Sequence, residues 1–166
     1  MKKISIVIIM CIVLPLVLAG CGGTPQITRP QPAEGAETFE IEGECEAELS
    51  GDVLKVSGSS NLMDGTNGII SVLNSDGTTA AKQKFTKEGD SVSHEFAVED
   101  EWEGVVYGFI TFDTENADKQ PKEVTEVYGK KFENFTGDSS EVMWNAKGVM
   151  AVFRSEPVEI TRADAE

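Results

Sequence analysis

The sequence predicts an all-β fold, an antiparallel β-sandwich of about seven or eight strands, and three observations lead to this prediction. Apolar residues alternate with polar ones along several short segments, which is the period of a half-buried strand. Turn residues, mainly Gly and Asp, separate these segments at short intervals. Apolar residues at helical spacing occur in one brief segment only. Such a run of strands favours a sandwich and leaves a closed barrel as the alternative.

The first two predicted strands form a hairpin. From Phe39 to Leu49, six small or apolar positions alternate with five glutamates, and the pattern resumes over Val53–Ser57. Gly51-Asp52 lies between the two segments as a two-residue turn. In the register that this turn sets, three pairs face each other: Leu49 with Leu54, Glu48 with Lys55, and Ala47 with Val56. Both faces match in this register, which supports the hairpin.

A second hairpin is predicted from Gly68–Leu73 and Thr79–Phe85. Asp76-Gly77 lies between these segments and suits a two-residue type I′ turn. Five residues are expected to share the inner face of this hairpin: Ile70, Val72, Ala81, Gln83 and Phe85. The lysines of the second segment, Lys82 and Lys84, are then left on the outer face.

Further strands are predicted toward the C-terminus. Alternation places four residues inward on the next strand: Val92, His94, Phe96 and Val98. Val105–Phe112 is apolar on both faces, which predicts a central and best-buried strand. The last strands are predicted around Val142–Trp144 and over Val149–Ile160, where Pro157 implies an edge or a bulge.

One helix of two turns is predicted in the long connection before these last strands. Val124, Val127 and Tyr128 have helical spacing, Pro121 precedes them and Gly129 follows. Pro at the start and Gly just past the end are typical of helix termini.

Composition excludes several functions. The chain has 166 residues, 14 Lys plus Arg against 29 Asp plus Glu, and a net charge of −15. Nucleic acid is therefore not an expected partner, because phosphate contacts need a basic stripe.

The residue types that catalysis needs are scarce. His94 is the single histidine, and its position in the alternating pattern of its strand predicts a core side chain rather than a catalytic base. Cys45 lies on the apolar face of its segment, which predicts an inert buried thiol. We predict no enzyme, no catalytic residue and no cofactor.

The N-terminus indicates export. Lys2 and Lys3 precede an apolar run over Ile4–Leu18, which is short for a transmembrane span and is typical of a signal peptide, here residues 1–20. Leu18-Ala19-Gly20-Cys21 resembles the lipobox of bacterial lipoproteins. The resemblance implies cleavage before Cys21 and a diacylglycerol thioether on that residue, hence a membrane partner. The alternative is a signal anchor with a coincidental Cys.

A tether, a domain and a tail are predicted after the signal. Residues 21–38 hold the lipidated Cys21 and a segment rich in Gly and Pro, residues 39–160 the sandwich, and residues 161–166 the tail. Removing the signal takes away Lys2 and Lys3 and no acid, so the net charge of −15 becomes −17. The domain resembles immunoglobulin-like or fibronectin-like domains of bacterial surface lipoproteins. That resemblance covers the architecture and implies no functional residue.

Candidate binding residues remain open between two interpretations. Aromatic side chains lie in or beside the irregular connections: Trp102, Tyr128, Phe132, Phe135 and Trp144. Trp102, Tyr128 and Trp144 could stack on a glycan or anchor a protein, or the group could form a plug over the core. The glutamates of Glu40–Glu48 are a solvated outer face or a contact for a basic partner. Turn-forming oxygens at Asp64–Gly68, Asn74–Gly77 and Glu99–Glu103 could bind calcium, but they match no calcium-loop pattern, and no metal ligand is predicted.

The sequence therefore predicts a lipid-anchored protein on the extracytoplasmic side of a plasma or outer membrane. Its predicted function is that of a non-catalytic binding module with a protein or glycan partner at the cell surface. A receptor for a small ligand or carbohydrate is the first alternative, and a small hydrolase is the second.

Overall fold

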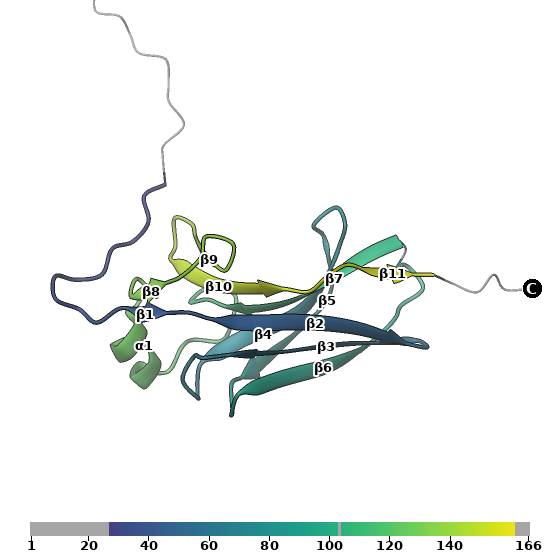
Figure 1. Cartoon of the computed structure of the whole chain (residues 1–166), viewed down its shortest axis with the longest axis horizontal. Helices are drawn as coiled ribbons and strands as arrows, with labels where there is room; N and C mark the ends of the chain where they lie inside the picture. The colour runs from purple at the N-terminus through teal and green to yellow at the C-terminus, as the bar shows by residue number, and fades with distance from the viewer. Residues whose placement is uncertain (1–26, 103, 162–166) are drawn as a thin grey trace, which may run out of the picture.

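The structure is a computed structural model in which residues 27–102 and 104–161 are described. The predicted signal peptide, the lipobox with Cys21, and most of the predicted tail lie outside these residues. The described residues form eleven strands and one helix (Figure 1). The strands are β1 (Phe39–Glu40), β2 (Gly43–Ser50), β3 (Val53–Ser60), β4 (Asn67–Asn74), β5 (Thr79–Thr86), β6 (Ser91–Ala97), β7 (Gly104–Phe112), β8 (Phe135–Thr136), β9 (Val142–Trp144), β10 (Val149–Arg154) and β11 (Val158–Ile160). The helix is α1 (Lys122–Tyr128).

Nine of the strands build an antiparallel sandwich of two sheets, and β1 and β8 form a separate two-stranded pair. One sheet has the order β2-β3-β6, and the other has the order β5-β4-β7-β10-β9 with β11 also paired to β7. Seven strands have six or more residues. The first, second and fifth of these (β2, β3 and β6) form one sheet, and the third, fourth, sixth and seventh (β4, β5, β7 and β10) belong to the other. This is the constant-type immunoglobulin arrangement with the fourth strand moved to the opposite sheet. The predicted all-β antiparallel sandwich with one short helix is confirmed; the four strands besides these seven, β1, β8, β9 and β11, have two or three residues each.

The hairpin of β2 and β3 has the predicted register. Three predicted pairs are observed: Leu49 with Leu54, Glu48 with Lys55, and Ala47 with Val56. Gly51 has φ +59°, which a glycine adopts without steric cost. At Gly58 the strands approach so closely that a Cβ atom would stand 2.0 Å from the carbonyl oxygen of Glu44.

The hairpin of β4 and β5 has the predicted faces but a wider turn. Ile70 pairs with Gln83, and the loop is Ser75–Gly77, closed by a hydrogen bond of 2.9 Å from the Asn74 amide to the Thr78 carbonyl. The predicted type I′ turn is wrong, because it needs positive φ at two residues and the loop has it at Gly77 alone. Hydrogen bonds from the amide and hydroxyl of Thr78 to the Asp76 carboxylate stabilise the longer loop.

The segment predicted as one strand from Phe39 to Leu49 is divided. β1 pairs in parallel with β8, and the chain joins β3 only from Gly43 onward. Ile41 lies at the crossing, 2% exposed, and its amide donates to the Thr136 carbonyl at 2.7 Å. The alternation of apolar and charged side chains continues through the break, which is why the sequence pattern does not reveal it.

β7 is central, as predicted. It pairs with β4 along one edge and with β10 and then β11 along the other. Residues 155–157 separate β10 from β11, so Pro157 marks an interruption of an edge, as expected. Burial alternates along β7, and β4 carries the longer buried run, Gly68–Val72. The expectation that β7 is the best-buried element is therefore wrong, because one of its faces is only half-covered.

The helix closes one end of the sandwich together with aromatic side chains. α1 begins after Pro121 and ends at Gly129, which has φ +88°, so both predicted boundaries are confirmed. Tyr128 lies edge-on to Phe39 and Phe135, with ring centroids 5.2 Å and 5.0 Å apart, and Phe132 stacks on Phe135 at 4.5 Å. Phe132 has φ +54°, an unusual value for a bulky residue, and it is fully buried in this cluster. In Figure 1 the cluster's elements, β1, β8 and α1, lie at one end of the molecule.

Candidate functional site

The predicted aromatic site residues are not brought together. Trp102 and Tyr128 are each 4% exposed, whereas Trp144 is 43% exposed on the edge strand β9. Trp102 lies in the connection that precedes β7, and Tyr128 lies on α1 beyond the other end of that strand. Burial places Trp102 and Tyr128 in the core, as in the interpretation of these aromatics as a plug. Trp144 is the one of the three that a partner can reach.

Tyr128 uses its polar end inside the protein. Its hydroxyl accepts a hydrogen bond of 2.8 Å from the Met63 amide, and burial raises the pKa of this phenol. A buried tyrosine with a satisfied hydroxyl and edge-on aromatic neighbours is typical of a packing residue.

Trp144 contacts the segment that leads into the domain. The guanidinium carbon of Arg29 lies 5.6 Å from the centroid of the Trp144 ring, and the same guanidinium donates to the Phe135 carbonyl. Residues 27–38 therefore approach the domain beside β8 and β9, at the end closed by α1.

Cys45 and His94 have the surroundings of core residues. Burial raises the pKa of the Cys45 thiol to about 12, which disfavours the nucleophilic thiolate at neutral pH. His94 is half-buried, pairs with Val56 across the strands, and its ring lies 4.6 Å from Phe96.

A candidate binding surface lies on the outer face of the six-stranded sheet. Four residues on four adjacent strands are direct neighbours across this face: Lys82 on β5, Ser71 on β4, Phe109 on β7 and Arg154 on β10. The guanidinium carbon of Arg154 lies 5.4 Å from the centroid of the Tyr107 ring. We give the name Phe109 surface to five exposed or half-buried side chains of this face on β7, β10 and β9; they are Tyr107, Phe109, Met143, Val152 and Arg154.

Two hollows meet at Phe109. A hollow of about 260 Å³ lies toward β4 and β5, with Ile69, Leu73 and Lys82 in its lining. A hollow of about 500 Å³ lies between Val152–Arg154 of β10 and Gly43–Cys45 of β2, and Glu44 and Glu141 are among its lining residues. The larger hollow has the size of a ligand site, and both hollows combine apolar with charged side chains.

The edge of this surface exposes further apolar area. Met143 is 47% exposed and shares the outer face with Met150, its partner across β9 and β10. β9 pairs with Val149–Ala151 only, so on the edge of β10 opposite β7 no described strand pairs with Val152–Arg154. Exposed methionine side chains are adaptable contact area for a partner.

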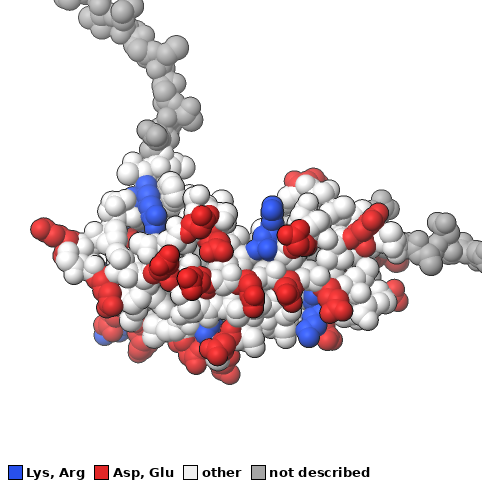
Figure 2. Space-filling model, viewed as in Figure 1, with Lys and Arg blue, Asp and Glu red and all other residues white. Residues whose placement is uncertain are grey.

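Charge is unevenly divided between the two sheets. Among the described residues, the three-stranded sheet carries one Lys or Arg, Lys55, and four acids on its strands: Glu44, Glu46, Glu48 and Glu95. Figure 2 shows many acidic and few basic side chains over the face that β2 crosses in Figure 1. Lys82 and Arg154 of the six-stranded sheet form no ion pair within the described part of the chain. The Phe109 surface is therefore the less acidic face.

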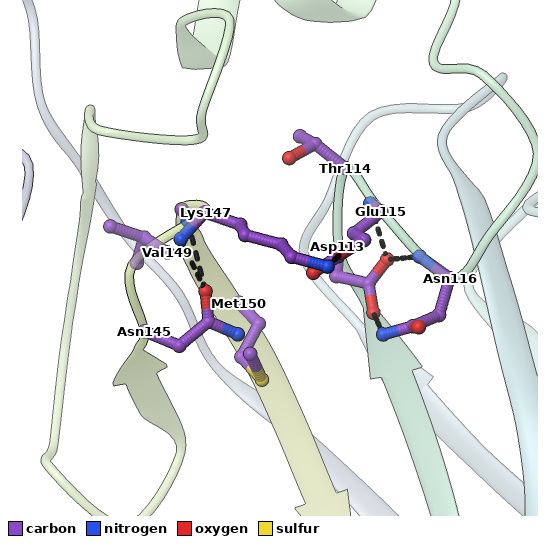
Figure 3. A pocket seen from close by; sticks show the side chains of 9 residues that line it. Asp113, Thr114, Glu115, Asn116, Asn145, Lys147, Val149 and Met150 are labelled. Atoms are coloured by element: carbon purple, nitrogen blue, oxygen red, sulfur yellow. Dashed lines mark hydrogen bonds and ion pairs between the residues drawn. The ribbon is translucent and has the colours of Figure 1, made fainter.

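A group of polar residues around Asp113, drawn in Figure 3, holds a loop in place and is structural. The Asp113 carboxylate accepts hydrogen bonds from the amides of Glu115, Asn116 and Ala117 at 2.7–3.1 Å and from the Asn116 side chain. Lys147 forms an ion pair with Glu115 across this loop (Figure 3). The hollow between them measures about 10 Å³, which is room for a single water molecule.

The loops weighed as calcium sites use their oxygens locally. Asp64 accepts hydrogen bonds from Lys87 Nζ and the Gly89 amide, and Asp76 accepts from Thr78. Within residues 27–102 and 104–161, no group of three or more His, Cys, Asp or Glu side chains is arranged to hold a metal ion. The same residues contain no helix long and apolar enough to cross a bilayer.

Phe109, Met143 and Arg154 were not predicted as site residues. One signal was available: Val105–Phe112 is apolar on both faces, yet a domain of one sandwich covers only one face of each sheet. The second apolar face of this strand therefore had to be either covered by another element or left open. Comparison of the chain with protein-family models, with curated proteins and with solved structures finds no match.

Proposed function

We propose that the protein is a lipid-anchored, extracytoplasmic binding module that captures a protein partner through the Phe109 surface. The observation that carries the proposal is the open outer face of a central strand, where Phe109 lines two hollows and the exposed Met143 lines one of them. Aromatic, methionine and arginine side chains are enriched in protein interfaces.

The anchoring part of the proposal rests on the sequence. Lys2 and Lys3, the apolar run over Ile4–Leu18, and the lipobox-like Leu18-Ala19-Gly20-Cys21 support export and lipidation at Cys21. A thioether-linked diacylglycerol brings two acyl chains, which is enough for stable membrane attachment. Fractionation of a Cys21→Ala variant tests this part. Recovery of the variant in the membrane fraction would contradict the anchor.

A matched pair of substitutions tests the binding part. Met143→Ala removes exposed apolar area from the Phe109 surface, and Val53→Ala removes it from the opposite sheet, where Val53 is 38% exposed. After cross-linking in cells and affinity capture, Met143→Ala should recover less partner, and Val53→Ala should recover as much as the wild type. Equal recovery by both variants, with unchanged melting temperatures, would remove the Phe109 surface from the proposal.

A glycan is the second candidate partner, because the half-buried ring of Phe109 lines both hollows. Aromatic rings stack on the flat faces of sugars through apolar contact. Phe109→Leu keeps the apolar volume and removes the ring. We expect a protein partner to lose less affinity from this change than a glycan partner loses. The binding loss measured for Phe109→Leu with each kind of partner therefore discriminates between the candidates.

A further inference from the structure

A hollow lined by three lysines lies beside α1. It measures about 480 Å³, and its lining residues are Thr114, Lys119, Gln120, Lys122, Thr125 and Lys130. No Asp or Glu lines it. The chain as a whole has 29 acids and 14 bases, so a hollow with three ammonium groups and no carboxylate is unusual for this protein. We call it the lysine hollow.

The ammonium groups of the lysine hollow are available to a ligand. Lys119 and Lys130 form no ion pair among the described residues. Lys122 pairs with Glu126 at 2.9 Å, but their side chains are 80% and 61% exposed. An ion pair this exposed is weak and screened by salt, so an anion can compete for Lys122.

The backbone that carries these lysines is held in place. Gln120 is 6% exposed. Its side-chain oxygen accepts a hydrogen bond from the Asn67 amide, and its side-chain nitrogen donates to the carbonyls of Asn67 and Asp113. The Asp113 carboxylate fixes the start of the same connection (Figure 3). Lys119 and Lys122 therefore project from a fixed loop and the first turn of α1, although their side chains remain flexible.

The position of the hollow adds a second argument, which rests on the proposed anchor. Arg29, whose guanidinium donates to the Phe135 carbonyl, and the pairing of β1 with β8 bring the N-terminal segment to the end of the domain that α1 closes. If Cys21 carries the anchor, as proposed above, this end is the one nearest the bilayer. The local cations then face a surface rich in phosphate, although the whole domain is acidic.

We propose that the lysine hollow binds a phosphoryl-bearing anion. A phosphate monoester offers three acceptor oxygens and close to two negative charges, which suits three flexible point charges better than a single carboxylate. The phosphodiester of a lipid headgroup carries one charge, and a membrane surface presents many such groups together. The hydroxyls of Thr114 and Thr125 lie in the same lining as hydrogen-bond partners. The phosphoryl group comes from a free phosphate compound or from a lipid headgroup, and the role of the headgroup rests on the proposed anchor.

Lysine acylation measured by mass spectrometry tests the proposal and separates the two sources. In the first arm, the unanchored Cys21→Ala chain is acylated in solution with and without pyrophosphate. In the second arm, the full-length protein is acylated in phosphatidylcholine vesicles with and without phosphatidylglycerol. The ligand should lower acylation of Lys119 and Lys130 about threefold, through charge-assisted contacts, and leave Lys55 on the opposite sheet unchanged.

The outcomes are distinct. Protection in the first arm assigns a free phosphate compound, and the result stands even if the anchor is refuted. Protection in the second arm alone assigns the headgroup. Three outcomes overturn the proposal. The first is protection in neither arm, and the second is equal protection of Lys55. The third is protection of Lys130 that is not weakened by Lys119→Gln. Equal protection by acetate would also overturn it, because the site would then not select phosphoryl groups.

Discussion

The guanidinium of Arg29 lies over the indole ring of Trp144, with 5.6 Å between the guanidinium carbon and the ring centroid. The two residues are far apart in the sequence, and their contact attaches the N-terminal segment to the edge strand β9. The same guanidinium donates to the Phe135 carbonyl. Arg29 therefore joins three segments: the one that leads into the domain, β8 and β9.

Replacing Arg29 should expose Trp144 with little loss of stability. Arg29→Ala removes the cation from the ring face, and an exposed cation–π contact contributes about 0.5–1 kcal/mol. Acrylamide quenching of tryptophan fluorescence measures the change, because Trp144 is 43% exposed and Trp102 is only 4% exposed. We expect the accessible fluorescence fraction to be quenched more strongly in Arg29→Ala, and Gln31→Ala to behave as the wild type. Unchanged quenching would show that the two residues are not in contact in solution.

Gly58 should not tolerate a side chain. A Cβ atom there would stand 2.0 Å from the Glu44 carbonyl oxygen and 2.6 Å from Cδ1 of Ile110, so Gly58→Ala must separate β2 from β3 or displace the core. Overpacking of this kind costs about 1–3 kcal/mol, and the backbone clash places Gly58→Ala at the upper end. Urea unfolding measures the loss. The neighbouring Ser57→Ala, on the outer face of the same strand, is the control and should change the midpoint little.

The Cys45 thiol should make the protein less stable in alkaline solution. Its pKa is raised to about 12 by burial in the folded state, whereas an unfolded cysteine has a pKa of about 8.5. The unfolded chain therefore loses this proton first, and the contribution of Cys45 to stability, complete below pH about 8.5, is lost as the pH rises toward the folded pKa.

Urea midpoints of the wild type and of Cys45→Ala, measured from neutral pH upward, isolate this contribution. Lys and Tyr residues also titrate in this range, but they are the same in both proteins. The wild-type midpoint should fall more steeply with pH than that of Cys45→Ala. Parallel curves would mean that the thiol ionises as readily in the folded protein as in the unfolded chain.

Asp113 should hold the connection between β7 and α1. Its carboxylate, 4% exposed, accepts three backbone hydrogen bonds, and Asp113→Ala leaves those amides without a partner. Hydrogen bonds to a charged group contribute about 1.5–3 kcal/mol each to stability, and the combined loss is smaller because water replaces some of them. Amide hydrogen exchange should accelerate over Glu115–Gln120 in this variant. Asn116→Ala, which removes one side-chain donor, should have a much smaller effect; equal acceleration would refute the role of Asp113.

The sequence predicted those elements whose local and non-local signals agree. The β2–β3 hairpin has a glycine turn and matching faces, and its register was predicted pair by pair. The length of the β4–β5 loop was not predicted correctly. The hydrogen bonds from Thr78 to the Asp76 carboxylate outweigh the preference of an Asp-Gly pair for a two-residue loop. The break between β1 and β2 has no local signal, since the partner of β1 is β8, far along the chain.

The candidate site was predicted less well than the fold. Trp144 is exposed, but Trp102 and Tyr128 are buried, because an aromatic residue in a connection can fold back over the core as readily as it can face solvent. Phe109 and Arg154 become neighbours only through the pairing of β7 with β10. Lys119 and Lys130 flank α1, and nothing in their spacing indicates a shared hollow. Such groupings depend on tertiary structure.

The attachment of Arg29 has a mechanical consequence. A pull on the chain at Ile27 reaches Arg29 first, and only the contact with the Trp144 ring and the hydrogen bond to the Phe135 carbonyl hold its side chain. β1 bears load afterwards, because it pairs with β8 and is followed by Ile41, which is 2% exposed in the core. The segment before β1 therefore yields before the sandwich does. Residues 27–38 can then extend to about 40 Å, which lets the domain move outward under load without unfolding.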